Sequence, residues 1–464
     1  MRSTPEIDAR TGLDKLATYP YAILTWVDDA GYPVSVAVEA TTDPAAGTAT
    51  TAAPAGLTVL TDRPVSLTGS HIRPQPGYGY DERRHVTVWG RVAASPDGAD
   101  RLTLTATTAW GWDEAEVPFF EYSERSVGKS RKYFDALSRE RGTPIRPRLS
   151  FGFLALRTTR LPFLSATIVP VVLGIVIAAS HGAFDLFSAI LTIIGASFVQ
   201  LAINVSNDVF DTMQGADDAN VTPTQFSGGS RVLQYGLVTF RQMATLGAGL
   251  YAAGALVGLL LLAIRGSTEL LAIGLIGFVV GIGYTAPPLK LVYRGLGEIA
   301  VAIGFGPLML LGAYVVQTRG ALSWEPFVVS IPVALLVALI LYVNEIPDRR
   351  GDAHAGKRTL PVRFSRSAVI GGYRVAALGA YVAVVAGVLV GILPIPTLLA
   401  LLTLPLALQV SRTLEPNYDN PYGLMAVMGV NIKLHLVVGL ALLAGYAVVL
   451  VVQAFAPSVP LFVR

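Results

Sequence analysis

Two groups of carboxylate and amide side chains are the residues of this chain best suited to chemistry. They are Asn204-Val205-Ser206-Asn207-Asp208-Val209-Phe210-Asp211 and Asn344-Glu345-Ile346-Pro347-Asp348-Arg349-Arg350-Gly351-Asp352. Each group lies at the end of a long apolar segment, where ionisable side chains are costly unless they pair, face a cavity or take part in a reaction. The two groups are therefore the first candidates for an active site.

Within each group the oxygen-bearing residues recur at helical intervals. In the first group, Asn204, then Asn207 or Asp208, and then Asp211 lie at i, i+3 or i+4, and i+7. In the second group, Asn344, Asp348 and Asp352 lie at i, i+4 and i+8. Each set would line one face of a helix that continued through it. Carboxylates this close together repel unless a cation lies among them, and Mg2+ favours one or two carboxylates together with water and phosphate oxygens. The pattern predicts a metal-bridged diphosphate as the ligand.

The composition indicates a membrane protein with a separate N-terminal part. Of 464 residues, 52% are hydrophobic and 14% charged, and the mean hydropathy is +0.54, which is too apolar for an ordinary soluble enzyme. Most charges lie in the first third, so we expect a domain of residues 1–147 and a membrane domain of residues 148–464. The absence of cysteine excludes disulfides and thiolate chemistry, and no nucleic-acid motif is present.

About nine segments are long enough to cross the roughly 30 Å hydrocarbon core of a bilayer. They are 161–180, 184–207, 242–264, 268–286, 296–317, 326–346, 368–391, 394–411 and 424–455. Basic residues cluster on alternate connections, and the N-terminus has no apolar signal segment. We expect a protein of the cytoplasmic membrane, with its N-terminal domain and both acidic groups on the cytoplasmic side and its C-terminus outside.

Further cations are predicted on the same side of the membrane as the acidic groups. Arg231 follows a Gly-Gly-Ser sequence, and the other polar residues that could hold phosphate oxygens are Tyr284, Lys290, Arg294, Lys357 and Arg358. Each cation could instead serve only to fix the topology. In the last span, Asn431, Lys433 and His435 could contact substrate or make hydrogen bonds between helices.

At these residues the chain resembles the UbiA superfamily of intramembrane prenyltransferases, and within it the 1,4-dihydroxy-2-naphthoate prenyltransferases of menaquinone synthesis. The resemblance covers residues 150–460 or so. It rests on Arg160-Leu161-Pro162, Pro170 with Gly174, Asn204 to Asp217, Tyr284-Thr285, Tyr293 to Glu298, Asn344 to Asp352, Gly356 to Leu360 and Leu434-His435. Glu345-Ile346-Pro347 and Phe226 to Ser230 differ from the commonest versions, which leaves the acceptor open.

The resemblance implies a Mg2+-dependent transfer of a polyprenyl group from its diphosphate to an aromatic acceptor, with carboxylate loss in the naphthoate branch. Asp208, Asp211, Asp217, Asp348 and Asp352 would be the metal ligands, and all of these except Asp217 would act in catalysis together with Lys357. The implied substrate-binding residues are Arg160, Asn204, Asn207, Arg231, Tyr284, Lys290, Arg294, Asn344, Arg358 and His435. The implied partners are the diphosphate, the acceptor and membrane lipid.

The N-terminal domain is predicted to consist mostly of strands. Residues 21–27 and 34–38 flank a turn at 28–31 and indicate a hairpin, with further strands at 57–61 and 85–92 and a basic helix at 123–141. The domain resembles, more weakly, the split barrels of pyridoxamine-phosphate oxidases and flavin reductases. Such domains often bind FMN, so both an FMN site and a purely structural or regulatory barrel stay open. Trp110-Gly111-Trp112 is better explained as buried core than as a stacking site.

Two other functions fit parts of the pattern. An enzyme of the same fold could use another acceptor, such as a different quinone precursor, a chlorin, haem or a lipid. A cation-coupled transporter would explain repeated halves and intramembrane charges. It fits less well, because the carboxylates are predicted at one membrane face beside cations rather than at the midplane within interrupted helices.

Overall fold

The computed structural model describes residues 6–56, 58–59, 63–74, 80–95, 98–146, 149–220 and 222–463. The chain divides into two compact units, Met1–Lys132 and Tyr133–Arg464.

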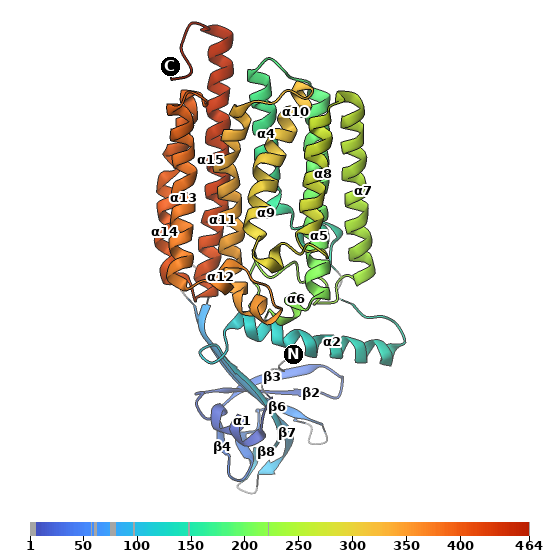
Figure 1. Cartoon of the computed structure of the whole chain (residues 1–464). Helices are drawn as coiled ribbons and strands as arrows, with labels where there is room; N and C mark the ends of the chain where they lie inside the picture. The colour runs from blue at the N-terminus through green and yellow to red at the C-terminus, as the bar shows by residue number, and fades with distance from the viewer. Residues whose placement is uncertain are drawn as a thin grey trace. The chain divides into compact units, whose positions relative to one another are not determined.

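The first unit is built on one antiparallel sheet in the order β3-β2-β6-β7-β8-β5-β4, with β1 paired to β8 (Figure 1). It is a β half-barrel, which confirms the predicted split-barrel-like class. Its elements are β1 (Glu6–Ile7), α1 (Ala9–Leu16), β2 (Ala22–Val27), β3 (Pro33–Val38), β4 (Ala40–Asp43), β5 (Thr48–Ala52), β6 (Val65–Pro74), β7 (Tyr80–Ser95) and β8 (Gly98–Asp113).

Local chemistry explains the predicted hairpin of β2 and β3. The Asp28 side chain accepts a hydrogen bond from the Tyr32 N–H at 2.8 Å, and Gly31 supplies the positive φ of +86° that the turn requires. The predicted strand at 85–92 lies within β7. The predicted strand at 57–61 falls largely outside the described residues, and Thr58 and Val59 are not in a strand.

Side chains of the first unit fill its own core. Leu13 and Leu16 of α1 pack with Leu24 and Leu67 of the sheet, and all four are almost completely buried. Trp112 is also buried, and its ring stacks on Tyr122 with centroids 4.5 Å apart. Trp112 therefore belongs to the core, as predicted, whereas Trp110 is only half-buried and its ring stacks on the same tyrosine with centroids 6.0 Å apart.

The second unit is a helical bundle (Figure 1). The helix α2 (Phe119–Arg141) crosses the division between the units. The elements that follow it are α3 (Phe151–Thr159), η1 (Leu161–Leu164), α4 (Ser165–Ser180), α5 (Leu186–Met213), α6 (Ala216–Ala219), α7 (Phe240–Arg265), α8 (Thr268–Gly283), η2 (Val292–Arg294), α9 (Gly297–Ile303), η3 (Gly304–Leu308), α10 (Met309–Thr318), α11 (Trp324–His354), α12 (Leu360–Arg363), α13 (Arg366–Leu389), η4 (Ile395–Thr403), α14 (Leu404–Asn417) and α15 (Pro421–Phe455).

Helices at the predicted positions are long and apolar enough to span a membrane. Seven qualify among the described residues: α5, α7, the continuous α9–α10, α11, α13, the η4–α14 segment and α15. The apolar helices α4 and α8 are shorter, at 16 residues each. Together they account for the expected set of about nine. The protein is therefore an integral membrane protein with a mostly β first unit, as predicted.

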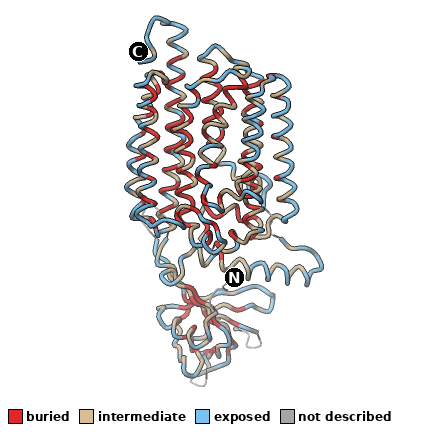
Figure 2. The backbone as a smooth tube through the Cα atoms, in the orientation of Figure 1, coloured by how far each residue is buried: buried red, intermediate tan, exposed pale blue. Residues whose placement is uncertain are grey.

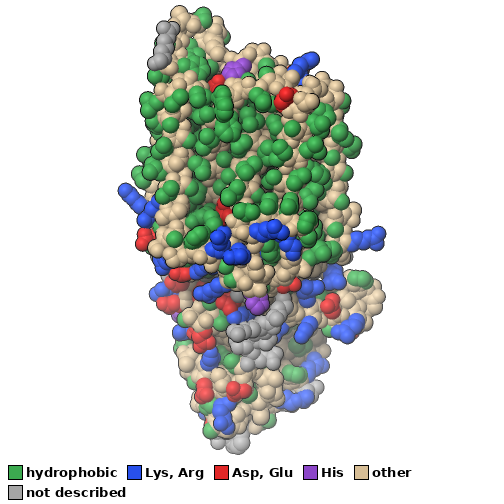
Figure 3. Space-filling model, viewed as in Figure 1, with side chains coloured by type: hydrophobic (Ala, Val, Ile, Leu, Met, Phe, Trp, Pro, Cys, Tyr) green, Lys and Arg blue, Asp and Glu red, His purple; other side chains and the backbone are tan. Residues whose placement is uncertain are grey.

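Polar caps and an apolar core hold the bundle. Asp185 caps α5, Thr239 and Gln242 form a capping box on α7, and Ser323 caps α11. The largest buried cluster joins α4, α10, α11, α13 and α15, and the buried residues follow the inner parts of these helices (Figure 2). The face of the bundle seen in Figure 3 carries a broad apolar band with Lys and Arg along one border.

Candidate active site

Both acidic groups lie on continuous helices, as their spacing predicted. The helix α5 runs through the first group to Met213, and α11 runs through the second to His354 despite Pro347 inside it. Asp208, Asp211 and Asp352 are buried. The carboxylates therefore project from two ordered helices.

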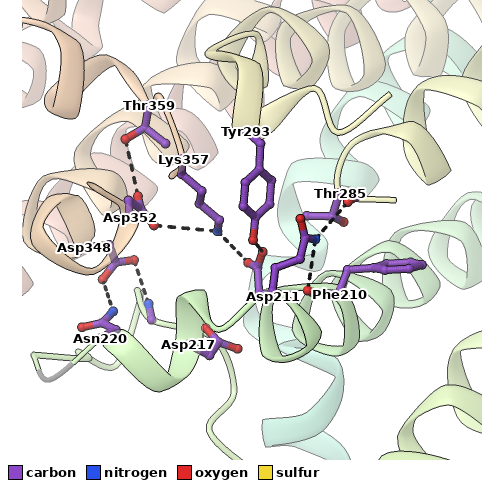
Figure 4. A network of polar contacts seen from close by, with 12 residues as sticks. Phe210, Asp211, Asp217, Asn220, Thr285, Tyr293, Asp348, Asp352, Lys357 and Thr359 are labelled. Carbon is purple, nitrogen blue, oxygen red and sulfur yellow. Dashed lines mark hydrogen bonds and ion pairs between the residues drawn. The ribbon is translucent and has the colours of Figure 1, made fainter. Parts of the chain in front are cut away.

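Lys357 joins the two acidic groups. Its ammonium group lies 2.8 Å from Asp211 Oδ2 on α5 and 3.7 Å from Asp352 Oδ1 on α11 (Figure 4). Burial alone would lower the pKa of Lys357, but the charges of Asp211 and Asp352 outweigh it and raise the pKa well above its usual value. Lys357 is therefore a fixed buried cation between the groups.

Neutral donors complete the surroundings of these carboxylates. The Tyr293 hydroxyl donates to Asp211 Oδ1 at 2.9 Å, and the Thr359 hydroxyl lies 3.4 Å from Asp352 Oδ2 (Figure 4). Asp211 is thus held from both sides, by Tyr293 and by Lys357. The sequence had placed Tyr293 only within a motif, without a role in the site.

The loop at residues 226–231, which precedes α7, binds one carboxylate of each group through its backbone. The Gly228 N–H donates to Asp348 Oδ2 at 2.9 Å, and the Ser230 N–H donates to Asp208 Oδ2 at 3.0 Å. Asn220 adds a second hydrogen bond to Asp348, from Nδ2 to Oδ1 at 2.8 Å (Figure 4). Sequence reasoning missed Asn220, because an amide in a loop has no periodic signal.

Asp217 brings a further carboxylate to this loop. A Cβ at Gly229 would lie 3.0 Å from both oxygens of Asp217 and 3.2 Å from Asp208 Oδ1, and Gly229 has a φ of +73°. Only glycine fits this close approach. Burial first, and then the charges of Asp211 and Asp208, raise the pKa of Asp217 well above its usual value.

Two oxygens of this acidic cluster are left without partners. Asp208 Oδ1 and Asp217 Oδ2 are buried and make no hydrogen bond within the described part of the chain. Buried carboxylate oxygens are costly unless they are paired or bind a cation. However, no group of three carboxylate or histidine side chains among the described residues is close enough to hold a metal alone. These carboxylate oxygens suit a hard cation that also binds water or phosphate oxygens, as Mg2+ does in proteins.

An apolar cavity of about 600 Å3 begins beside the carboxylates. Its polar lining residues include Arg160, Asn204, Asn207, Tyr284 and Asn344. Asn204 and Asn344 lie one helical turn from Asp208 and Asp348. Most of the remaining wall comes from the aliphatic, glycine and phenylalanine residues of α5, α7, α8, α9, α10 and α11.

Two predicted arginines, the buried Arg231 and the half-buried Arg160, bind backbone carbonyls. Arg231 donates to the Asp217 carbonyl and, at 3.3 Å, to the Asn220 carbonyl. Arg160 donates to the Phe226 carbonyl at 2.9 Å. Both arginines therefore position the backbone around the carboxylates.

Four other predicted substrate-binding residues do not pair with these carboxylates in the described part of the chain. Arg294 donates to the Pro288 carbonyl at 2.9 Å, and the Lys290 ammonium lies 5.5 Å from the centre of the Tyr293 ring. The side chain of Arg358 is exposed, although its neighbour Lys357 is buried. His435 is buried in α15 beside Ser165 of α4; the next residue, Ala166, lines the cavity, although His435 itself does not.

A sequence model of the UbiA prenyltransferase family matches residues 167–428, more than half of the chain. The chain belongs to the UbiA prenyltransferase family. It is accordingly a prenyltransferase, and the matched region contains both acidic groups and Lys357.

Two relatives with assigned names are similar to this chain. The 2-carboxy-1,4-naphthoquinone phytyltransferase of Synechocystis sp. is 29% identical over 300 residues, which are 63% of this chain and 92% of the relative. The 1,4-dihydroxy-2-naphthoate octaprenyltransferase of Mycobacterium tuberculosis is 33% identical over 245 residues, 52% of this chain and 79% of the relative.

A solved family structure, a UbiA homolog from Archaeoglobus fulgidus bound to DMAPP and Mg2+, is 16% identical. It aligns with a TM-score of 0.46 over 62% of this chain and 99% of its own. The family match begins after the first unit, and no observation on the described residues supports FMN binding there. The flavin site stays a prediction.

Proposed function

We propose that the protein transfers a polyprenyl group from a polyprenyl diphosphate to 1,4-dihydroxy-2-naphthoate, the reaction named for several of its relatives, in menaquinone synthesis. One observation carries the proposal. Carboxylates of α5 and α11 meet around the buried Lys357, next to the polar end of an apolar cavity. This arrangement suits a ligand with a charged diphosphate head and a hydrocarbon tail.

Mg2+ is the cofactor that the acidic residues fit best. Its proposed ligands are Asp208, Asp211, Asp217, Asp348 and Asp352. When bound, Mg2+ would offset the charge on the diphosphate as the allylic C–O bond breaks. The unpartnered oxygens of Asp208 and Asp217 support the assignment.

The chain's own residues would act around the breaking bond. Lys357 is cationic and desolvated, so it would stabilise the negative charge that develops on the leaving diphosphate. The cavity wall would exclude water that could otherwise capture the allylic cation. Arg231 and Arg160 would keep the backbone around the carboxylates in place.

The acceptor is proposed to bind at the polar end of the cavity. Arg160 there could pair with the acceptor carboxylate, while Asn204, Asn207, Tyr284 and Asn344 could bind its hydroxyl groups. The ring carbon that bears the carboxylate attacks the allylic carbon and forms a C–C bond. Its C–CO2 bond then breaks, CO2 leaves, and the bonding electron pair restores the aromatic ring.

Lys290, Arg294, Arg358 and His435 remain proposals from the sequence. The first three could meet the donor as it approaches the site, because Arg294 and Arg358 are exposed and Lys290 is only partly buried. The buried Nε2 of His435 makes no hydrogen bond within the described residues, so this nitrogen is available to a substrate, whereas the rest of the side chain packs between helices.

We place the protein in the cytoplasmic membrane, with the site and the first unit on the cytoplasmic side and the C-terminus outside. The positive-inside pattern supports this orientation. We also propose that residues 148–464 form the prenyltransferase domain, because every residue assigned to chemistry lies within them.

The test uses membranes that contain the full chain. They are supplied with Mg2+, labelled polyprenyl diphosphates and a panel of aromatic acceptors, including 1,4-dihydroxy-2-naphthoate labelled at its carboxyl carbon. We expect prenylated naphthol and one labelled CO2 per transfer. Transfer only to another acceptor would keep the enzyme class and reject this substrate. Transfer to none, with donor hydrolysis also absent, would reject the proposal.

A further inference from the structure

The helix α3 exposes apolar side chains although it is too short to span a membrane. It has nine residues, whereas a span needs about 20. Phe151 is 86% exposed, Phe153 47% and Leu156 44%. Phe153 and Leu156 are three positions apart and share one side of the helix, the α3 outer face. Phe151, the first residue of the helix, is exposed as well, and no described part of the second unit covers these three side chains.

The other side of α3 packs against the end of the bundle that carries the carboxylates. Leu154 packs into a cluster with Val205 and Val209 of α5 and Met243 of α7. Met243 lies in the first turn of α7. The helix α3 therefore lies level with the beginning of a membrane span, where the hydrocarbon core gives way to headgroups.

The last turn of α3 is attached to the loop at 226–231. Arg157 Nε donates to the Ser230 carbonyl at 2.9 Å, and Arg160, directly after α3, donates to the Phe226 carbonyl. The backbone N–H groups of the same loop bind Asp348 and Asp208. A shift of α3 would thus move the loop that orients the carboxylates.

We propose that α3 is an interfacial helix whose outer face lies at the boundary between lipid headgroups and acyl chains, and that Arg157 transmits its position to the 226–231 loop. Aromatic and aliphatic side chains favour that boundary. The exposed cations Arg139, Arg141 and Arg146 shortly before α3 complement lipid phosphates. The outer face also continues the apolar outside of the bundle, where Phe240 and Leu246 of α7 are exposed.

The location of the outer face can be measured without enzyme activity. The natural chain has no cysteine, so a single cysteine can be placed at 151, 153 or 156 and spin-labelled in lipid vesicles. Tyr32 of the first unit, 69% exposed, and Leu275 in the middle of α8, 59% exposed, are the matched controls. Collisions with oxygen report lipid, and collisions with a water-soluble nickel complex report water.

We expect labels at 151, 153 and 156 to collide with oxygen far more often than the label at 32, and with nickel more often than the label at 275. Labels accessible only to nickel would overturn the proposal, because the outer face would then lie in water. Labels protected from both reagents would also overturn it, because protein would cover this face.

The positioning role of Arg157 rests on the proposed function and has its own measurement. Loss of support behind metal ligands typically costs 10- to 100-fold in metal affinity. Arg157→Gln should therefore raise the Mg2+ concentration for half-maximal transfer by about 10-fold or more, and Arg157→Lys should return that concentration most of the way to the natural value. The double variant Phe153→Ser, Leu156→Ser should also raise the Mg2+ concentration for half-maximal transfer. An unchanged Mg2+ requirement in properly folded Arg157→Gln would reject the coupling. Absence of transfer in the natural protein would reject the proposed function and leave the spin-label result standing.

Discussion

Replacing Lys357 with methionine, which has a similar length and no charge, should impair both stability and transfer. The ammonium group lies 2.8 Å from Asp211 and 3.7 Å from Asp352, in a buried position. Removing one partner of a buried ion pair typically destabilises a protein by about 3–5 kcal/mol, because the remaining charge is uncompensated. A lost charge-assisted hydrogen bond to the diphosphate would cost about 1.5–3 kcal/mol, or roughly 10- to 150-fold in rate.

Mg2+ should restore much of the stability of Lys357→Met but little of its activity, since the cation would offset the uncompensated charge of Asp211 and Asp352 without replacing the ammonium. Thermal unfolding in detergent with and without Mg2+ measures the first effect, and initial transfer rates measure the second. Arg350→Met is the matched control, because Arg350 is an exposed cation on the same part of α11. Equal stability and equal rates for Lys357→Met and the natural protein would refute the reasoning.

Three further outcomes follow from the described contacts. Asn220→Ala removes the hydrogen bond to Asp348 and should reduce transfer about 10- to 100-fold at low Mg2+; an unchanged rate would remove Asn220 from the site. A hydrogen bond to Glu325 raises the pKa of His181. The contact between these two side chains therefore stabilises the fold fully below the unfolded pKa of about 6.5, and this stabilisation is lost as pH rises through the folded pKa. Melting temperatures from pH 6 to 9 should show this loss in the natural protein, and the same pH dependence in His181→Gln would contradict the assignment. Residues 148–464 alone should insert and retain prenyl transfer, and complete inactivity of a properly inserted truncated chain would show that the first unit contributes to catalysis.

The sequence predicted the helical part of the site because α5 and α11 follow a simple period. Asp208 and Asp211, and likewise Asp348 and Asp352, share a helix face whenever the helix continues, and both helices do continue. Lys357 was predicted from its chemistry and its motif. Its position between Asp211 and Asp352 depends on how α5, α11 and the following loop pack together, which no local pattern contains.

Other contacts could not be predicted because they depend on loops. The Gly-Gly-Ser sequence before Arg231 was predicted only to lie beside the phosphate-binding residues, yet in this structure the N–H groups of Gly228 and Ser230 bind carboxylates. In the first unit, the hairpin of β2 and β3 had a clear turn signal. The strands β4 and β5 were not predicted, because their alanine and threonine residues alternate little in hydrophobicity.

The central claim is that acidic residues from both helices act on one Mg2+-bound diphosphate. Its most direct test compares prenyl transfer by Asp208→Ala, Asp348→Ala and the natural protein, each shown to be inserted and folded, over a range of Mg2+ concentrations. We predict that each substitution alone reduces transfer by more than the roughly 100-fold upper range of indirect effects, and that EDTA inactivates the natural protein while added Mg2+ restores it. Near-normal transfer by either variant would contradict the claim.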